Sequence, residues 1–250
     1  MNLPAVAGPD EARPRGQLGR AAPVLACLVA AACSVPIRAA RADTPWEVWP
    51  ELTYYYGLSP ATRLFLDASQ TKGLESKKSS LNLSAAYDFS IMPIVRKHLR
   101  TLDWERKRYF WARVGYSHIA SADNGVQTNA EQRAVLALYT RVPLPSDSWL
   151  EIRTRVDFRW IGGEYSDRYR IRLQASREIE VCERRFMPYA NVEWFYDTRY
   201  DGWARTTYEV GSEATYSKHF RYELYYARQD DHLPKPSDLN AVGLKFKWYY

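Results

Sequence analysis

The sequence has few cysteines and no apolar run long enough to cross a membrane as a helix. Cys27, Cys33 and Cys182 are the three cysteines in 250 residues, and removal of the leader described below would leave only Cys182. A single cysteine can form neither an internal disulfide nor a cysteine-type zinc cluster. The one apolar run, 21–33, has about a dozen residues, whereas a spanning helix needs roughly 20. We therefore expect neither a disulfide framework nor a helical membrane span.

The short apolar run belongs to an expected signal peptide. Arginines precede the run, and small residues at the positions of a cleavage site follow it and end at Ala42. A basic flank, a short apolar run and small residues at the cleavage site are typical of a secretory signal. We expect cleavage near Ala42, which divides the chain into a signal peptide, 1–42, and one mature domain, 43–250. The alternative is a lipoprotein-type signal that ends at Cys33, although the usual leucine is missing before it.

The mature segment also lacks a strong excess of either charge. The whole chain has a formal net charge of +6, from 35 basic and 29 acidic residues. The leader contains five of the basic and two of the acidic residues, so residues 43–250 have a net charge of +3. A run of Lys and Arg typical of a nucleic-acid-binding arm is absent as well. We therefore expect no nucleic-acid partner.

From Trp46 onward, apolar residues recur with a period of two rather than 3.6. Within 150–160 the even positions are apolar or Thr and the odd positions are charged, and 168–176 repeats this alternation after the turn Ile161-Gly162-Gly163-Glu164. Strict alternation predicts β-strands with one apolar face. Eleven such runs are visible, at about 46–56, 61–69, 80–90, 108–118, 130–141, 150–160, 168–176, 186–197, 203–217, 219–229 and 239–250.

We interpret these runs as an all-β fold, an antiparallel transmembrane β-barrel. Single-chain bacterial membrane barrels have even strand counts, so we favour twelve strands, with an unrecognised strand within 89–107, and keep ten as the alternative. A soluble sandwich or a lipocalin-like barrel would also show one apolar face per strand. The charges argue against it, because burying unpaired guanidinium groups costs several kcal/mol each. In a membrane barrel, by contrast, the apolar face meets lipid and the charged face lines a wet lumen.

The alternation assigns a set of charged side chains to the lumen. The expected pairing of the central hairpin places Arg155 opposite Arg172 and Arg159 opposite Arg168. The basic candidates are Arg113, Arg133, Arg141, Arg153, Arg155, Arg159, Arg168, Arg170 and Arg172. The acidic candidates come later in the chain and are Glu193, Asp197, Glu209, Glu213 and Glu223.

This order predicts a lumen that is basic on one arc and acidic on the other. Such a wall attracts anions to the basic arc, and guanidinium groups bind carboxylate or phosphate in a bidentate manner. The sequence therefore favours a narrow, porin-like transport channel for small anionic solutes. The alternative is that the charges pair across the lumen and brace a closed barrel with a structural or envelope-assembly role.

The chain ends on an amphipathic strand with aromatic residues on its apolar face. Phe246, Trp248 and Tyr250 resemble the terminal signal that the outer-membrane barrel-assembly machinery reads, although Phe most often ends it. Other aromatics gather near expected strand ends, where amphipathic rings favour the lipid–water boundary. These features predict the outer membrane of a Gram-negative bacterium, with outer-membrane lipid and the assembly machinery as partners.

Several short motifs resemble a known family. They are Trp-Pro-Glu-Leu at 49–52, Tyr-Tyr-Tyr-Gly-Leu at 54–58, Asp-Trp-Glu-Arg at 103–106 and Arg-Val-Gly-Tyr at 113–116. With the arginine-rich central hairpin, they resemble predicted bacterial outer-membrane proteins of the domain-of-unknown-function family 2490, over essentially the whole of 43–250. The resemblance implies a barrel and an outer-membrane address, but it supplies no reaction, substrate or site residues.

A catalytic constellation is not apparent in the sequence. Membrane-barrel lipases and deacylases use Ser and His with an orienting partner. Here Ser117 and His118 are adjacent in an expected strand, so they point to opposite faces, and no Gly-x-Ser-x-Gly elbow exists. The four histidines lack ligand-type spacing. We expect no metal, no cofactor and no enzyme activity; a membrane lipid hydrolase is the less favoured alternative.

Overall fold

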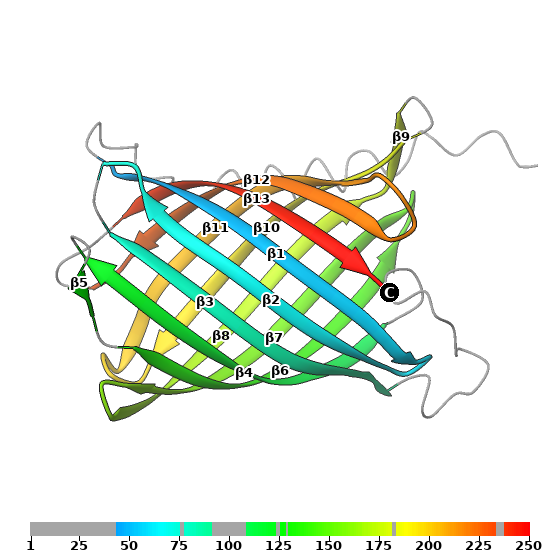
Figure 1. The fold of residues 1–250 in the computed structure, drawn as a ribbon. Coiled ribbons are helices and arrows are strands. Elements are labelled where there is room, and N and C mark those ends of the chain that lie inside the picture. The colour runs from blue at the N-terminus through cyan, green and yellow to red at the C-terminus, as the bar shows by residue number, and fades with distance from the viewer. Residues whose placement is uncertain are drawn as a thin grey trace, which may run out of the picture.

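The computed structural model describes residues 44–75, 78–91, 109–123, 126–128, 130–181, 184–233 and 238–250. Within these ranges the protein is an all-β fold whose strands close into one barrel, as predicted (Figure 1). The expected signal peptide lies outside the described residues. No helix in the described ranges is long and apolar enough to cross a membrane.

Eleven long strands form the barrel wall, and each overlaps one of the eleven runs found in the sequence. They are β1 (Trp46–Ser59), β2 (Thr62–Gly73), β3 (Ser79–Ser90), β4 (Phe110–Asp123), β6 (Glu131–Leu144), β7 (Ser148–Ile161), β8 (Glu164–Arg177), β10 (Arg184–Asp197), β11 (Gly202–Thr215), β12 (Phe220–Asp231) and β13 (Leu239–Tyr249). The short strand β9 (Ile179–Val181) extends the path of neighbours beyond β10, which gives twelve strands along it. The two-residue β5 (Val126–Gln127) pairs with β4 off this path.

The barrel closes between β1 and β13, which run parallel. Their register extends from Trp46 opposite Asn240 to Tyr55 opposite Tyr249, and all other neighbouring wall strands are antiparallel. When eleven strands each reverse direction, the first and the last point the same way. The extra strand expected within 89–107 falls largely outside the described residues, and β3 and β4 pair directly with each other.

This closure places the two ends of the described chain at opposite rims of the barrel (Figure 1). We call the end where β1 begins the N-terminal rim and the end where β13 finishes the C-terminal rim. The β7–β8 and β10–β11 turns lie at the N-terminal rim, and the β1–β2 and β6–β7 turns at the C-terminal rim.

Side chains of the wall alternate between an apolar outer face and a charged inner face. Along β7, Ile152 and Trp160 are 38% and 41% exposed, whereas Asp157 and Arg159 are 0% and 2% exposed. The same division holds on β13, where Val242 and Leu244 face outward. The period-two pattern therefore predicted the faces of these strands.

The expected register of the central hairpin was wrong by two residues. Ile161 pairs with Glu164, which leaves a two-residue turn of Gly162 and Gly163 with φ values of 60° and 93°. Positive φ at both central positions defines a type I′ turn, which glycine adopts without strain. Arg155 therefore pairs with Arg170, and the expected partners Arg159 and Arg168 are not opposite each other. A shift of two keeps every side chain on its predicted face.

Tyr225 of β12 ties the parallel closure together from inside the barrel. Its ring lies over Gly243, its partner on β13, and its hydroxyl donates a hydrogen bond to the carboxylate of Glu51 on β1. A Cβ atom on Gly243 would lie 1.9 Å from Cζ of Tyr225, so only glycine leaves room for the ring. Lys245 adds an ion pair to Glu51 at 2.9 Å. Side chains of two strands thus reach β1 across the closure.

Candidate functional site

The inside of the barrel holds a cavity of about 350 Å³, lined by side chains from all eleven wall strands. Its lining contains ten basic and six acidic side chains. Seven of the nine arginines predicted for the lumen line it: Arg113, Arg133, Arg141, Arg153, Arg155, Arg170 and Arg172. The predicted acids Glu209, Glu213 and Glu223 line it as well. Ten of the fourteen candidates thus line one cavity, whereas Arg159, Arg168, Glu193 and Asp197 do not.

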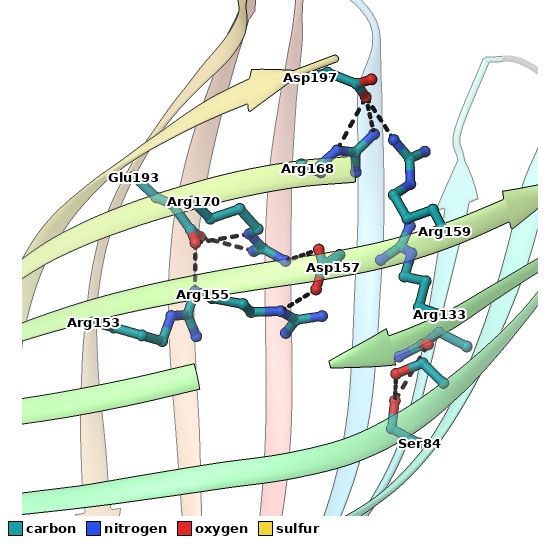
Figure 2. A network of polar contacts seen from close by, with 12 residues as sticks. Ser84, Arg133, Arg153, Arg155, Asp157, Arg159, Arg168, Arg170, Glu193 and Asp197 are labelled. Carbon is teal, nitrogen blue, oxygen red and sulfur yellow. Dashed lines mark hydrogen bonds and ion pairs between the residues drawn. The ribbon is translucent and has the colours of Figure 1, made fainter. Parts of the chain in front are cut away.

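Arginines of β6, β7 and β8 form one side of the cavity, and each carboxylate among them holds two guanidinium groups. Figure 2 shows Glu193 accepting hydrogen bonds from Arg153 at 2.6 Å and from Arg170 at 2.9 Å. Asp157 accepts from Arg155 at 2.5 Å and lies 3.7 Å from Arg170. Alternation along the strands aims these side chains inward, and the hairpin register brings them within reach of one another.

Glu151 joins the same wall nearer the C-terminal rim. Its two carboxylate oxygens accept hydrogen bonds from Arg141 and from Arg172, each at 2.8 Å. Such charge-assisted bonds are stronger than neutral ones and fix the guanidinium planes. We call the six cavity-lining arginines of these three strands the arginine wall: Arg133, Arg141, Arg153, Arg155, Arg170 and Arg172.

A second group of ion pairs lies between the cavity and the N-terminal rim. Asp197 at the end of β10 accepts hydrogen bonds from Arg159 at 2.5 Å and from Arg168 at 3.1 Å, as Figure 2 shows. Arg159 also donates to Glu131 at the start of β6. None of these four residues lines the cavity. We call them the Asp197 belt; they join β6, β7, β8 and β10 beside the cavity.

The opposite side of the cavity carries acidic residues and two lysines. In the order of strands around the barrel, β7 lies opposite β13 and β1. Lys247 of β13 forms ion pairs with Glu213 at 2.6 Å and with Glu223 at 2.5 Å. Lys245 lies 2.9 Å from Glu51. This side therefore has its own paired charges, with carboxylates in the majority.

Two carboxylates of the cavity have only neutral hydrogen-bond donors. Asp67 of β2 accepts from the hydroxyl of Thr53 at 2.9 Å. Glu209 of β11 accepts from the hydroxyl of Tyr189 at 2.6 Å and from the amide of Asn191 at 3.1 Å. Within the described ranges, neither has a basic group at ion-pair distance. Asp67 and Glu209 are therefore the two cavity-lining carboxylates without a cationic partner in the described part of the chain.

Comparison with protein families identifies the chain. A family model described as a protein of unknown function, DUF2490, matches residues 95–240, more than half of the sequence. The chain belongs to this family. A search of the curated proteins finds no match. The matched range begins after β3 and is narrower than the resemblance noted for 43–250. Because the family has no assigned function, the DUF2490 match supplies no site residues.

Sequence reasoning missed several charged residues of this DUF2490 barrel. Lys245 and Lys247 alternate with Phe246 and Trp248, so the parity of β13 already placed them inside. The parity of β1 and β2 places Glu51 and Asp67 inside as well. Positive and negative side chains are consequently more interleaved than in the expected basic and acidic arcs. Glu151 and Asp157 lie among the arginines, and Lys245 and Lys247 lie among the acids.

The residues proposed as an assembly signal lie on the outer face of β13 near the C-terminal rim. Phe246, Trp248 and Tyr250 are 36%, 37% and 72% exposed. The rings of Phe220 and Trp248 lie 4.7 Å apart between centroids. This placement leaves the apolar face of the last strand accessible, and its recognition stays a prediction.

Other chemistry is sparse within the described residues. Ser117 faces the interior and shares a hydrogen bond of 2.8 Å with Ser84, whereas the adjacent His118 points to the other face of β4. The described part of the chain contains no group of three or more His, Cys, Asp or Glu side chains arranged to hold a metal ion. The cavity is therefore the strongest candidate for a functional site.

Proposed function

We propose that this DUF2490 protein spans the outer membrane of a Gram-negative bacterium as a barrel. A closed sheet pairs every backbone group with a neighbour, which hydrocarbon requires. The described outer face is rich in exposed Leu, Val, Ile, Tyr and Trp side chains. Water would make such a surface prone to association, whereas lipid accepts it. Outer-membrane lipid and the barrel-assembly machinery are the partners that this address implies.

Aromatic groups near both rims support the membrane assignment. Trp160 and Tyr165 lie 5.4 Å apart at the N-terminal rim, and Phe220 and Trp248 lie 4.7 Å apart at the C-terminal rim. Amphipathic rings favour the lipid–water boundary and form girdles at both interfaces of membrane barrels. The two rims would thus lie at the two membrane surfaces.

Within that barrel, we propose a narrow channel that favours small anionic solutes. The observation that carries this proposal is the lining of the cavity, which contains ten basic and six acidic side chains. Asp88, Glu131, Asp157 and Glu193 bond to lining arginines without lining the cavity themselves. A confined lining with a basic excess raises the local concentration of anions. Several guanidinium groups along the lining also offer an anion a series of weak binding sites. Such a series favours passage of the anion over tight binding at one site. We propose no catalytic role, because Ser117 and His118 face opposite sides of β4.

The test is the reversal potential of single channels in a planar bilayer under a gradient of KCl. We expect anion selectivity for the natural protein. A variant with Arg133→Gln, Arg170→Gln and Arg172→Gln should lose about threefold or more of that selectivity, because three charges leave the lining. Every carboxylate that bonds to these arginines keeps another arginine in this variant, so the wall stays braced.

A matched control removes a basic group outside the cavity. Arg185 of β10 is 52% exposed in its side chain and lies near the C-terminal rim. Arg185→Gln should leave the reversal potential within experimental error of the natural value. A natural channel that selects cations, or a triple variant as selective as the control, would contradict the proposed anion preference.

The second candidate is a closed barrel with a structural or envelope-assembly role. The Asp197 belt favours it, because this belt places ion pairs of largely buried side chains between the cavity and the N-terminal rim. Absence of conductance in a preparation with native heat-modifiable mobility on gels would favour this candidate over the channel.

The odd number of wall strands in the described ranges gives a prediction about topology. We take the C-terminal rim as periplasmic, because the assembly machinery is expected to bind the last strand there. The start of the mature chain should then lie at the cell surface. An epitope tag placed directly before Thr44 should bind antibody on intact cells, whereas a tag within 216–219 should need permeabilised cells. Surface labelling of the second tag alone would contradict this orientation.

A further inference from the structure

We infer that the cavity binds a small dipolar solute, one that carries an anionic group and a protonated amine on the same molecule. The inference rests on the proposed function, in which the cavity binds the anionic group of a small solute, and it adds a cationic group to that solute. Its basis is an excess of basic groups on one side of the cavity and an excess of carboxylates on the facing side.

The arginine wall has more cations than its carboxylates balance. Within the described ranges, its six arginines share four carboxylate partners, which are Glu131, Glu151, Asp157 and Glu193. Glu131 is in addition bonded to Arg159 of the Asp197 belt. A positive excess therefore remains where this wall meets the cavity, and a carboxylate or phosphate group would stabilise it.

The facing side has more carboxylates than basic groups. Five acids line the cavity from β1, β2, β11 and β12. The basic residues that line it from these strands and β13 are Lys245, Lys247 and Arg63, and Arg63 is bonded to Asp88. Lys245 and Lys247 are engaged with Glu51, Glu213 and Glu223. This leaves Asp67 and Glu209, whose partners in the described ranges are all neutral. An ammonium group placed near either carboxylate would gain a charge-assisted hydrogen bond.

The strand order sets these two sides against each other. β7 lies at the centre of the arginine wall, and the strands opposite it are β13 and β1, which β2 and β12 flank. A simple anion would interact favourably with one side only. A dipolar solute would bring a favourable charge to both, and a cavity of about 350 Å³ lies within the range of small-molecule sites.

Three probes of equal chain length test the inference on the purified, folded protein in detergent. They are 4-aminobutyrate, which carries both charges, butyrate, which carries only the carboxylate, and butylammonium, which carries only the amine. Binding is measured by titration calorimetry or by saturation-transfer NMR. We expect 4-aminobutyrate to bind at least about tenfold more tightly than either single-charge probe, because it alone satisfies both sides.

Variants assign the preference to the named carboxylates. Asp67→Asn with Glu209→Gln should bring 4-aminobutyrate to within about twofold of butyrate, because the amides accept hydrogen bonds without attracting an ammonium group. Glu164→Gln, an exposed change at the β7–β8 turn, should keep the full preference. The inference is overturned if the natural protein binds 4-aminobutyrate no better than butyrate, or if the double variant keeps the preference.

These outcomes are separate from those of the channel test. An anion-selective channel without a preference for 4-aminobutyrate contradicts only the inference that the cavity binds a dipolar solute. A folded barrel that prefers 4-aminobutyrate but does not conduct contradicts only the proposed channel function.

Discussion

Replacing Gly243 with alanine is expected to weaken the closure of the barrel by about 3 kcal/mol, in the range of severe overpacking. The new Cβ atom would lie 1.9 Å from Cζ of Tyr225, so the ring must leave its place over β13. Tyr225 then loses its hydrogen bond to Glu51 on β1. Glu51 keeps its ion pair with Lys245 at 2.9 Å, so most of the cost comes from displacing the ring. Urea-induced unfolding of the purified protein measures the change.

The same substitution in a Tyr225→Ala protein shows whether the clash with the Tyr225 ring causes the loss of stability. In a Tyr225→Ala protein, Gly243→Ala should cost less than about 0.5 kcal/mol, because the ring it would displace is gone. Gly202→Ala in the natural background should also cost little, since its Cβ atom would approach nothing closer than 3.6 Å. An equal cost of Gly243→Ala with and without the Tyr225 ring would contradict this account of the closure.

Replacing Asp197 with asparagine should be the other large effect, about 3–5 kcal/mol of lost stability. Asp197 is 0% exposed and accepts hydrogen bonds from both Arg159 and Arg168. The amide has nearly the same shape but no charge, so Arg168 loses its counter-ion and the buried Arg159 keeps only Glu131. Removing one partner of a buried ion pair is far more costly than removing an exposed charge. Urea-induced unfolding again gives the free energy.

The matched control lies in the turn that follows Asp197. Asp201 is exposed and bonds to the hydroxyl of Tyr196 at 2.7 Å. Asp201→Asn should change stability by less than about 0.5 kcal/mol, as is usual for surface positions. Similar costs for the two substitutions would show that the Asp197 belt does not stabilise the barrel as its geometry indicates.

The strands and their faces could be predicted because both depend on local alternation. In β7, each step along the chain turns the side chain to the other face, so Arg155 and Val156 are assigned by parity alone. The same rule places Lys245 and Lys247 inside, because they alternate along β13 with the outward-facing Phe246 and Trp248. Eleven runs in the sequence correspond to the eleven wall strands for this reason.

The pairing of charges could not be predicted, because it depends on register and on closure. A turn with two glycines rather than a longer one moved Arg155 from Arg172 to Arg170. The partnership of Arg153 with Glu193 spans two strand neighbours, so two registers must be right before it can be deduced. The parallel pairing of β1 with β13 joins the two ends of the chain and leaves no local signal in either strand.

The central claim is that the apolar outer face meets lipid while the charged inner face lines an aqueous cavity. Spin labels on single cysteines in a Cys182→Ser background test it in liposomes. Leu136 on the outer face of β6 is 42% exposed, and Ser84 of β3 lines the cavity. We expect a label at position 136 to collide with oxygen and not with a water-soluble nickel chelate, and a label at position 84 to show the reverse preference. A label at position 136 that the nickel chelate reaches as readily as oxygen would contradict the account.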